Sequence, residues 1–199
     1  MKQLEKFFNN PIVYNLIQRI LAFAGSKTVY KKIGELIDAK PEVSVLDVGC
    51  GTGKYTEIFK ASNYVGVDIN DDYLNYARQQ YPFGRFINMD STKLSFADNS
   101  FKFVFSVSTF HHLSDDQAGR TAEEMKRVCA AGGTVYIIDN VFPSKINFIG
   151  YILFKLDRGR FQRSFSKMDE LLSRLGFSVV DRGLKNSFPY RYTVFAYNK

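Results

Sequence analysis

The sequence of 199 residues has little cysteine, histidine and proline and no tryptophan. Its two cysteines, Cys50 and Cys129, cannot build a disulfide framework and do not stand at a metal-ligand spacing, so we expect a reducing compartment, the cytoplasm, and no metal site. No apolar run approaches the length of a membrane span. The chain begins Met-Lys-Gln-Leu-Glu-Lys, without the apolar block of a signal peptide, so no targeting segment is expected.

Apart from these scarce residue types, the composition is typical of a globular protein of one domain, with 45% hydrophobic and 24% charged residues. The net charge of +7 is uneven, because residues 144–199 hold eleven Lys and Arg against four Asp and Glu, and the rest of the chain is neutral. This basic quarter indicates either an anionic partner or merely a soluble surface. Nucleic acid is one such partner, although no aromatic–basic motif of an RNA-binding module is present, and peripheral contact with an anionic membrane is another.

The chain is organised around Val43–Gly53, read Val-Ser-Val-Leu-Asp-Val-Gly-Cys-Gly-Thr-Gly. Its β-branched, apolar first part predicts a strand buried on both faces of a parallel sheet. Glycines at alternate positions then permit a tight turn and the close approach of a ligand, and residues 54–60 read as a short helix. A strand, a glycine turn and a helix start are the parts of a nucleotide-type site in a doubly wound fold. Asp47, at the end of the strand, adds a carboxylate that can hold an ammonium or an amide.

The spacing of these glycines narrows the choice of ligand. It is G-x-G-x-G after an acidic residue, whereas the dinucleotide fingerprint is G-x-G-x-x-G, and Lys54 is followed by Tyr55 rather than by the Ser or Thr of a P-loop. The run Asp-Val-Gly-Cys-Gly-Thr-Gly resembles motif I of class I S-adenosylmethionine-dependent methyltransferases. The resemblance implies that S-adenosylmethionine contacts Asp47 and the turn residues Gly49, Cys50, Gly51 and Gly53. The alternative is a glycine loop with a structural role only.

Acidic residues also follow the next two predicted strands. Asp68 ends the strand at 63–69, where a carboxylate can accept both ribose hydroxyls, with Ile69 beside it; its alternative role is to cap the next helix. After the strand at 86–88, Asp90 can accept from the adenine amino group. Met89 can lie on the adenine ring, and Ser91 follows at the same edge.

A second segment carries the family resemblance. Residues 94–101, Leu-Ser-Phe-Ala-Asp-Asn-Ser-Phe, resemble the L-P-F-x-D-x-S-F-D segment of small-molecule methyltransferases, although Ser95 replaces the usual proline and Lys102 the usual acid. Residues 101–107 read as a fourth strand, and we add Ser106 near its end to the cofactor contacts.

The two histidines of the chain, His111 and His112, follow this fourth strand, in the region that lies between cofactor and acceptor in similar enzymes. A histidine can act as a general base near neutral pH, so both are candidate base or positioning residues. Neighbouring side chains do not share a helix face, so we expect at most one of them to point into the site. The alternative is a histidine that binds the backbone or caps the helix from Ser114.

The acceptor side is predicted beyond the fifth strand, at 134–138, which Asp139 follows at the ligand-binding edge. Residues 146–156 read as a strongly apolar helix, and Arg158, Arg160 and Arg163 come directly after it. Guanidinium groups bind carboxylate or phosphate bidentately, so we assign these arginines to an acceptor with an acidic group. Asp139 is a further candidate substrate contact. The alternative is a core helix followed by a solvated basic loop. Near the N-terminus, Tyr14 is a candidate cofactor contact, with packing as its alternative.

Together these elements predict an α/β fold: one Rossmann-like, doubly wound domain with a seven-stranded, mostly parallel sheet. Residues 1–40 form N-terminal cap helices, 43–143 the cofactor-binding core and 144–165 an acceptor-site insertion. Strands at 176–180 and 192–196 make an antiparallel edge pair. The resemblance implies methyl transfer from S-adenosylmethionine to a small-molecule acceptor by a monomer or homodimer. RNA or protein methylation, and a non-catalytic cofactor-binding subunit, remain as alternatives.

Overall fold

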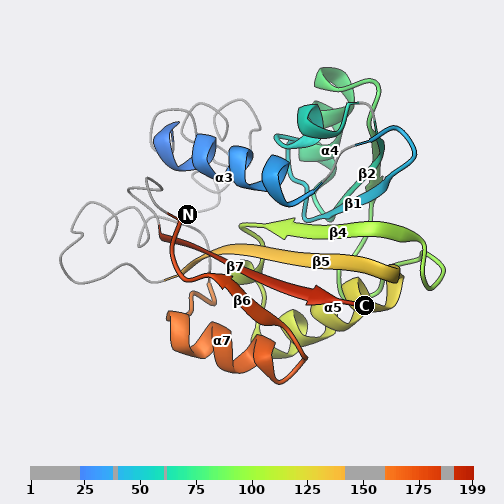
Figure 1. The fold of residues 1–199 in the computed structure, drawn as a ribbon. Helices are drawn as coiled ribbons and strands as arrows, with labels where there is room; N and C mark the ends of the chain where they lie inside the picture. Colours follow the sequence, from blue (N-terminus) through green and yellow to red (C-terminus); the bar gives the residue numbers. More distant parts are fainter. Residues whose placement is uncertain (1–22, 38–39, 61, 142–159, 185–190) are drawn as a thin grey trace.

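The computed structural model describes residues 23–37, 40–60, 62–141, 160–184 and 191–199 (Figure 1). Seven strands form one sheet in the order β3-β2-β1-β4-β5-β7-β6. The strands are β1 (Ser44–Val48), β2 (Asn63–Asp68), β3 (Arg85–Asn88), β4 (Phe101–Val107), β5 (Cys129–Val141), β6 (Ser178–Asp181) and β7 (Arg191–Asn198). The helices are α3 (Phe23–Leu36), α4 (Asp71–Gln80), α5 (Asp115–Val128) and α7 (Phe165–Ser173), with 3₁₀ turns η1 (Thr56–Phe59) and η2 (Phe110–His112). The predicted helix at 146–156 lies outside the described residues.

The sheet confirms the predicted Rossmann-like, mostly parallel architecture. β1 pairs in parallel with both β2 and β4, so the strand order reverses between β1 and β4. Ligands of such sheets bind outside the carboxyl ends of the strands at this switch point. The predicted antiparallel edge pair is confirmed: β6 and β7 pair antiparallel and are the last two strands on one side of the sheet, where β7 also pairs antiparallel with β5.

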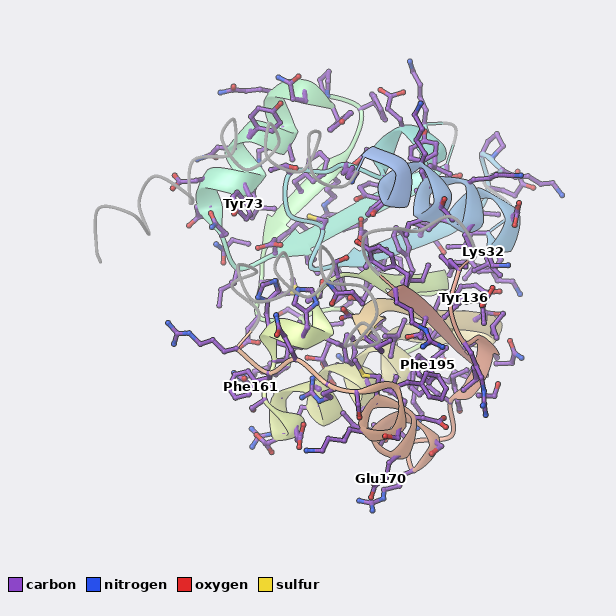
Figure 2. The ribbon with its side chains drawn as sticks, turned by 90° about the vertical axis from the view of Figure 1, so that its left-hand side faces the viewer. Lys32, Tyr73, Tyr136, Phe161, Glu170 and Phe195 are labelled. Carbon is purple, nitrogen blue, oxygen red and sulfur yellow. The ribbon has the colours of Figure 1, made fainter. Side chains whose placement is uncertain are left out.

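Helices cover both faces of the sheet, and the alternation along β1 assigns its residues to two cores. Leu46 belongs to the core beneath α5 and α7, whereas Val45 belongs to the core formed with α3, η1 and α4. Figure 2 shows Glu170 pointing outward from α7 and Phe195 of β7 inside the molecule, where it is fully buried. The sheet is therefore a buried central layer, as the apolar strands predicted.

Two elements differ from their predicted bounds. The segment after the glycine turn forms only the short 3₁₀ turn η1, which places Phe59 fully inside the core, rather than a helix over 54–60. β5 begins at Cys129 and ends at Val141, so it is longer at both ends than the predicted strand at 134–138. Its extension to Val141 follows from pairing with β7, which runs from Thr134 opposite Asn198 to Val141 opposite Arg191, while Cys129 at its start pairs with Phe101 of β4. Within the described ranges, no helix is long and apolar enough to cross a membrane.

Candidate active site

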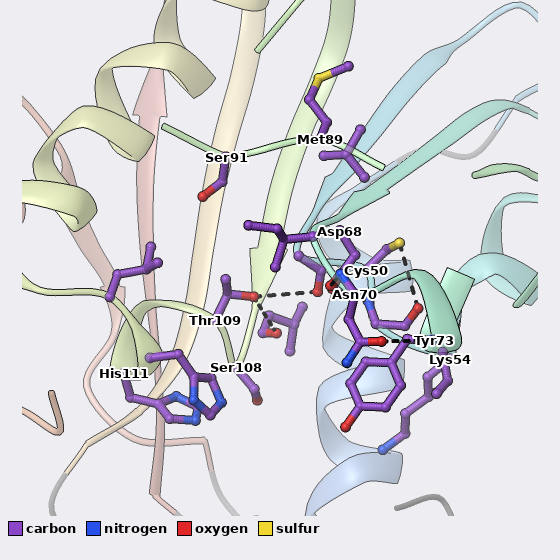
Figure 3. A pocket seen from close by; sticks show the side chains of 18 of the residues that line it. Cys50, Lys54, Asp68, Asn70, Tyr73, Met89, Ser91, Ser108, Thr109 and His111 are labelled. Atoms are coloured by element: carbon purple, nitrogen blue, oxygen red, sulfur yellow. Dashed lines mark hydrogen bonds between the residues drawn. The ribbon is translucent and has the colours of Figure 1, made fainter. Parts of the chain in front are cut away.

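A cavity of about 530 Å³ opens at the carboxyl ends of the central strands (Figure 3), a size typical of small-molecule and cofactor sites. Its walls come from the glycine turn, from the segments after β2, β3 and β4, from η2, and from the facing ends of β5 and β7. The predicted site residues that line it are Gly49, Cys50, Gly51, Asp68, Ile69, Met89, Asp90, Ser91, His111 and His112. The ends of four strands, β1 to β4, thus meet at one pocket.

The glycine turn serves the pocket in two different ways. Gly49, Gly51 and Gly53 all have positive φ, at 77°, 53° and 76°, a backbone conformation that residues other than glycine rarely adopt. A Cβ on Gly51 would meet nothing within 4 Å, so this position faces the open cavity, as its predicted close approach to a ligand requires. A Cβ on Gly49 would lie 2.3 Å from Oγ1 of Thr109, and Gly53, which does not line the cavity, packs against α4.

Asp68 is fixed at the cavity wall by main-chain donors. Its Oδ2 accepts from the amide of Gly51 at 2.8 Å, and its Oδ1 accepts from the amide of Asn70 at 2.9 Å. Burial raises the pKa of Asp68, while these amides counteract the rise. A carboxylate has four lone-pair sites, so hydroxyl groups of a ligand can still donate to it. Beside it, the Ile69 side chain is 72% exposed and offers an apolar surface.

Lys54 adds a cation to this half of the pocket that the sequence analysis did not single out. Its side chain lines the cavity, close to Tyr73 in Figure 3. Burial lowers the pKa of Lys54 to about 8, because an ammonium group loses hydration there. An anionic group of a ligand would stabilise the charged form. The feature of the sequence that could have identified Lys54 is its position directly after the last glycine of the turn.

Two predicted cofactor contacts lie inside the sheet instead of in the cavity lining. Asp47 is 1% exposed and accepts a hydrogen bond from the hydroxyl of Tyr64 at 2.8 Å, and burial raises its pKa to about 7. Ser106, also 1% exposed, donates to the carbonyl of Val48 at 2.8 Å. Neither side chain lines the cavity, so the structure gives both residues packing roles in place of a direct ligand contact.

The three residues after β3 line the cavity as predicted in position, each with a local partner. Oδ1 of Asp90 accepts from the amide and hydroxyl of Thr92, both at 2.8 Å. The Ser91 hydroxyl lies 3.0 Å from that of Thr121, and the Met89 sulfur accepts from a main-chain amide. The position of Asp90 leaves it able to accept from a ligand amino group, because a carboxylate takes several donors.

His111 lies across the cavity from Asp68 and Asn70 (Figure 3). Nδ1 of His111 lies 2.6 Å from Oδ1 of Asp139, and the His111 amide donates to the other carboxylate oxygen at 3.2 Å. The rings of His111 and His112 are 4.1 Å apart and both line the cavity. The expectation that at most one would point into the site was wrong, because η2 is a single 3₁₀ turn at the cavity edge, not a helix with one buried face.

Asp139 therefore differs from its predicted role as a substrate contact. It is fully buried, does not line the cavity, and holds the His111 ring through the contact at Nδ1. When Nδ1 of a neutral imidazole donates to a carboxylate, Nε2 is the unprotonated, basic nitrogen. This arrangement orients His111 and can stabilise its protonated form.

The predicted arginine cluster does not assemble in the cavity. Arg163 is 4% exposed, and its guanidinium donates to the carbonyls of Phe110 and Leu113 and to Asp115, each at 2.8 Å. It fastens the histidine turn and has no exposed face for an acceptor, which corrects the predicted substrate contact. Arg160 is exposed and does not line the cavity. Arg158 and Tyr14 lie outside the described residues.

Further polar residues that line the cavity were not among the predicted site residues. They include Ser108, which follows β4 with a positive φ of 55°, Asn140 at the end of β5, and Tyr192 at the start of β7. Asn140 could have been found, because it follows Asp139 at the edge where ligands bind. Tyr192 carried no signal, since an antiparallel strand brings its first residues to this edge only once it is paired.

Comparison with known proteins gives a consistent result. Residues 46–137 match the model of a family described as a methyltransferase domain. The chain is 31% identical over 144 residues to a demethylmenaquinone methyltransferase of Thermotoga maritima, an alignment that covers 70% of this chain and 62% of that protein. It is 28% identical over 166 residues to a protein of the same name from Bacillus cereus, with 77% and 69% covered.

Among solved structures, a protein of Thermotoga maritima described as a SAM-dependent methyltransferase and possible histamine N-methyltransferase superposes with a TM-score of 0.74. The superposition covers 98% of this chain and 99% of that one, at 17% identity, and so supports the fold alone. The chain spans slightly less than two thirds of the length of the Thermotoga demethylmenaquinone methyltransferase.

Proposed function

We propose that this chain is a class I S-adenosylmethionine-dependent methyltransferase that transfers a methyl group to a small, partly apolar acceptor, with His111 as general base. The observation that carries the proposal is the 2.6 Å contact between His111 and Asp139 at the edge of a cavity whose opposite wall is the glycine turn. A base and a nucleotide-type site thus share one pocket.

The residues present fit the cofactor. When bound, S-adenosylmethionine supplies an electrophilic methyl group on its sulfonium. The open space at Gly51 gives it room, since a Cβ there would meet nothing within 4 Å. Asp68 would accept from the ribose hydroxyls, and Lys54 would pair with the carboxylate of the amino-acid part. Ile69 and Met89 provide apolar contacts for the adenine ring.

Methyl transfer is an in-line displacement, so the protein acts mainly by alignment of acceptor and donor. An acceptor that carries a proton must lose it, and His111 takes that proton at Nε2. Asp139 keeps the imidazole in the tautomer that leaves Nε2 basic and stabilises the imidazolium that forms. The Arg163 hydrogen bonds hold the turn that carries this histidine.

The acceptor side favours a molecule with apolar rings. Val107, Leu113 and Tyr55 line the cavity, whereas Arg160 and Arg163 do not enter it, so an acidic group on the acceptor has less support than the sequence indicated. The names of the two relatives make demethylmenaquinone the first acceptor to test, in its reduced form, whose hydroxyl groups carry removable protons.

The alternatives are less well supported. A non-catalytic subunit is expected to have a filled acceptor site, whereas this cavity extends to His111 and Asn140. RNA or protein methylation rests only on the basic C-terminal quarter. The two cysteines are free and buried, which favours the reducing, cytoplasmic setting that we infer.

The test replaces the proposed base. His111→Gln and Asp139→Asn should each lower kcat about 10²-fold or more with reduced demethylmenaquinone, because a general base contributes about 10²–10⁴-fold. The affinity for S-adenosylhomocysteine, measured by calorimetry, should stay within twofold. A His111→Gln enzyme with wild-type kcat would exclude His111 as the base. Absence of S-adenosylhomocysteine binding to the wild-type chain would refute the proposed function itself.

A further inference from the structure

Asn140 is a buried polar residue that no part of the methyl-transfer proposal uses. It is 3% exposed, yet it lines the cavity. Its Oδ1 is buried without a hydrogen-bond partner among the described residues. Leaving such an atom unpaired costs free energy, so native proteins rarely do it without a ligand or a function to explain it. The orphaned carboxamide therefore marks a place where a ligand group belongs.

The neighbours of Asn140 extend this polar spot. Tyr192 is its register partner on β7, so the two side chains project from the same face of the sheet. The Ser108 hydroxyl lies 3.5 Å from the Tyr192 hydroxyl. Ser108 holds a φ of 55°, and backbone strain of this kind clusters at functional sites. Strands β5 and β7 and the residue after β4 thus each contribute one polar side chain to this part of the cavity.

This spot is separate from the histidine. Successive residues of a strand point to opposite faces, so Asp139 lies on the α5 side of β5 and Asn140 on the α3 side. Consistent with this, the neighbouring Ile137 and Ile138 belong to the core beneath α5 and α7 and to the core with α3 respectively. An acceptor in the cavity therefore meets two polar points, one at His111 and one at Asn140.

We propose that Asn140, flanked by Tyr192 and Ser108, binds a hydroxyl group of the methyl acceptor, and that this hydroxyl is distinct from the group His111 deprotonates. A hydroxyl fits because it can donate to Oδ1 or accept from Nδ2, so it satisfies either orientation of the carboxamide. The inference rests on the proposed function and narrows its acceptor to a small apolar molecule with two separated polar groups, such as a dihydroxylated aromatic ring system.

The residue would select between acceptors. A site built to hydrogen-bond a hydroxyl rejects an analogue without it, because its own polar group is then left buried and unpaired. Tight discrimination at Asn140 would come from this penalty, whereas the apolar walls can distinguish acceptors only weakly by size.

The experiment compares two probes that differ by one hydroxyl, 1,4-dihydroxynaphthalene and 1-naphthol. Binding is measured by fluorescence on the full chain, saturated with S-adenosylhomocysteine, under oxygen-free reducing conditions. The wild-type protein should bind the dihydroxy probe about tenfold more tightly, the free energy of one well-placed hydrogen bond. Asn140→Leu should abolish this preference while S-adenosylhomocysteine affinity stays unchanged.

A matched control is Asn75→Leu, the same change on the exposed surface of α4, which should keep the preference. Asn140→Leu should not lower the melting temperature, because the buried Oδ1 has no described partner to lose; should it fail to fold, Asn140→Ala replaces it. Equal wild-type affinities for the two probes, or a preference that survives in the Asn140 variant, would overturn the inference. If S-adenosylhomocysteine fails to bind at all, the proposed function fails first.

Discussion

Asp68 at the end of β2 is hydrogen-bonded to Gly51 of the glycine turn, whose amide donates to Oδ2 of Asp68 at 2.8 Å. The hydrogen bond ties the end of β2 to the turn after β1 and aims the carboxylate along the cavity wall. The positive φ of Gly51 is what lets its amide reach the carboxylate while its α-carbon faces open space.

Replacing Asp68 by Ala should weaken S-adenosylhomocysteine binding by about 1.5–3 kcal/mol, the range for hydrogen bonds to a charged group. Calorimetry on the folded variant measures this loss. Asp72→Ala, on the exposed first turn of α4, is the control and should bind like the wild type. Undiminished affinity in Asp68→Ala would mean that the ribose is bound elsewhere.

Lys54 predicts a dependence of cofactor affinity on pH. Its lowered pKa, about 8, means that it is largely protonated at pH 7 and largely neutral at pH 9. Only the ammonium form pairs with a carboxylate, so affinity for S-adenosylhomocysteine should fall as the pH rises through 8, and Lys54→Met should flatten that fall. 5′-Methylthioadenosine lacks the amino-acid part and serves as the control ligand. An equal pH dependence in wild type and variant would contradict the pairing.

The histidine turn η2 depends on a segment far along the chain. Phe161 donates its amide to the carbonyl of His111 at 3.0 Å, and Arg163 binds the carbonyls of Phe110 and Leu113. A three-residue turn makes few hydrogen bonds of its own, so these contacts set its position. The start of α7 is thereby coupled to the place where the proposed base stands.

Arg163→Gln should lower kcat without changing S-adenosylhomocysteine affinity, because the turn loosens while the glycine turn is untouched. It should also destabilise the fold by about 1–3 kcal/mol, since buried carbonyls lose their donors. Arg163→Lys should recover little, because an ammonium cannot reproduce the planar fork. Arg160→Gln, at an exposed position, is the control. A variant with wild-type kcat, assayed well below its melting temperature, would separate Arg163 from positioning.

Asp47 should affect how the free energy of unfolding of the whole protein depends on pH. Its folded pKa, about 7, stands above the ordinary value of 3.8, so between these values the folded state binds the extra proton. The free energy of unfolding should therefore decrease as the pH rises from about 4 to 7. Asp47→Asn keeps an acceptor for the Tyr64 hydroxyl and removes the titration.

Thermal unfolding at pH 5 and pH 8 measures this effect. We expect Asp47→Asn to be at least as stable as the wild type at pH 8 and to lose less stability between the two pH values. Asp72→Asn, on the surface, should follow the wild-type dependence. If Asp47→Asn is the less stable protein at pH 8, the carboxylate is stabilised in a way that burial does not explain.

The amino-acid sequence alone determined the parallel core and the half of the pocket around the glycine turn, where we propose that the cofactor binds. Three alternate glycines after a β-branched strand have few other uses, and carboxylates that follow parallel strands come to one edge by topology. Asp68 and the residues around Asp90 therefore lie where the sequence predicted, at the cavity. Their roles toward the cofactor stay predictions.

Only the tertiary structure decided which residues form the other half of the pocket, around His111 and Asn140, where we propose that the methyl acceptor binds. The direction of a side chain at a strand end depends on which strand or turn packs beside it, and those neighbours are distant in the chain. His111 meets Asp139, 28 positions away, and Arg163 turns inward to carbonyls about 50 positions away. Asn140 faces the cavity beside Tyr192 only because the antiparallel β7 pairs with β5. Local pattern sets which residues end a strand, whereas long-range packing sets which of them a ligand can reach.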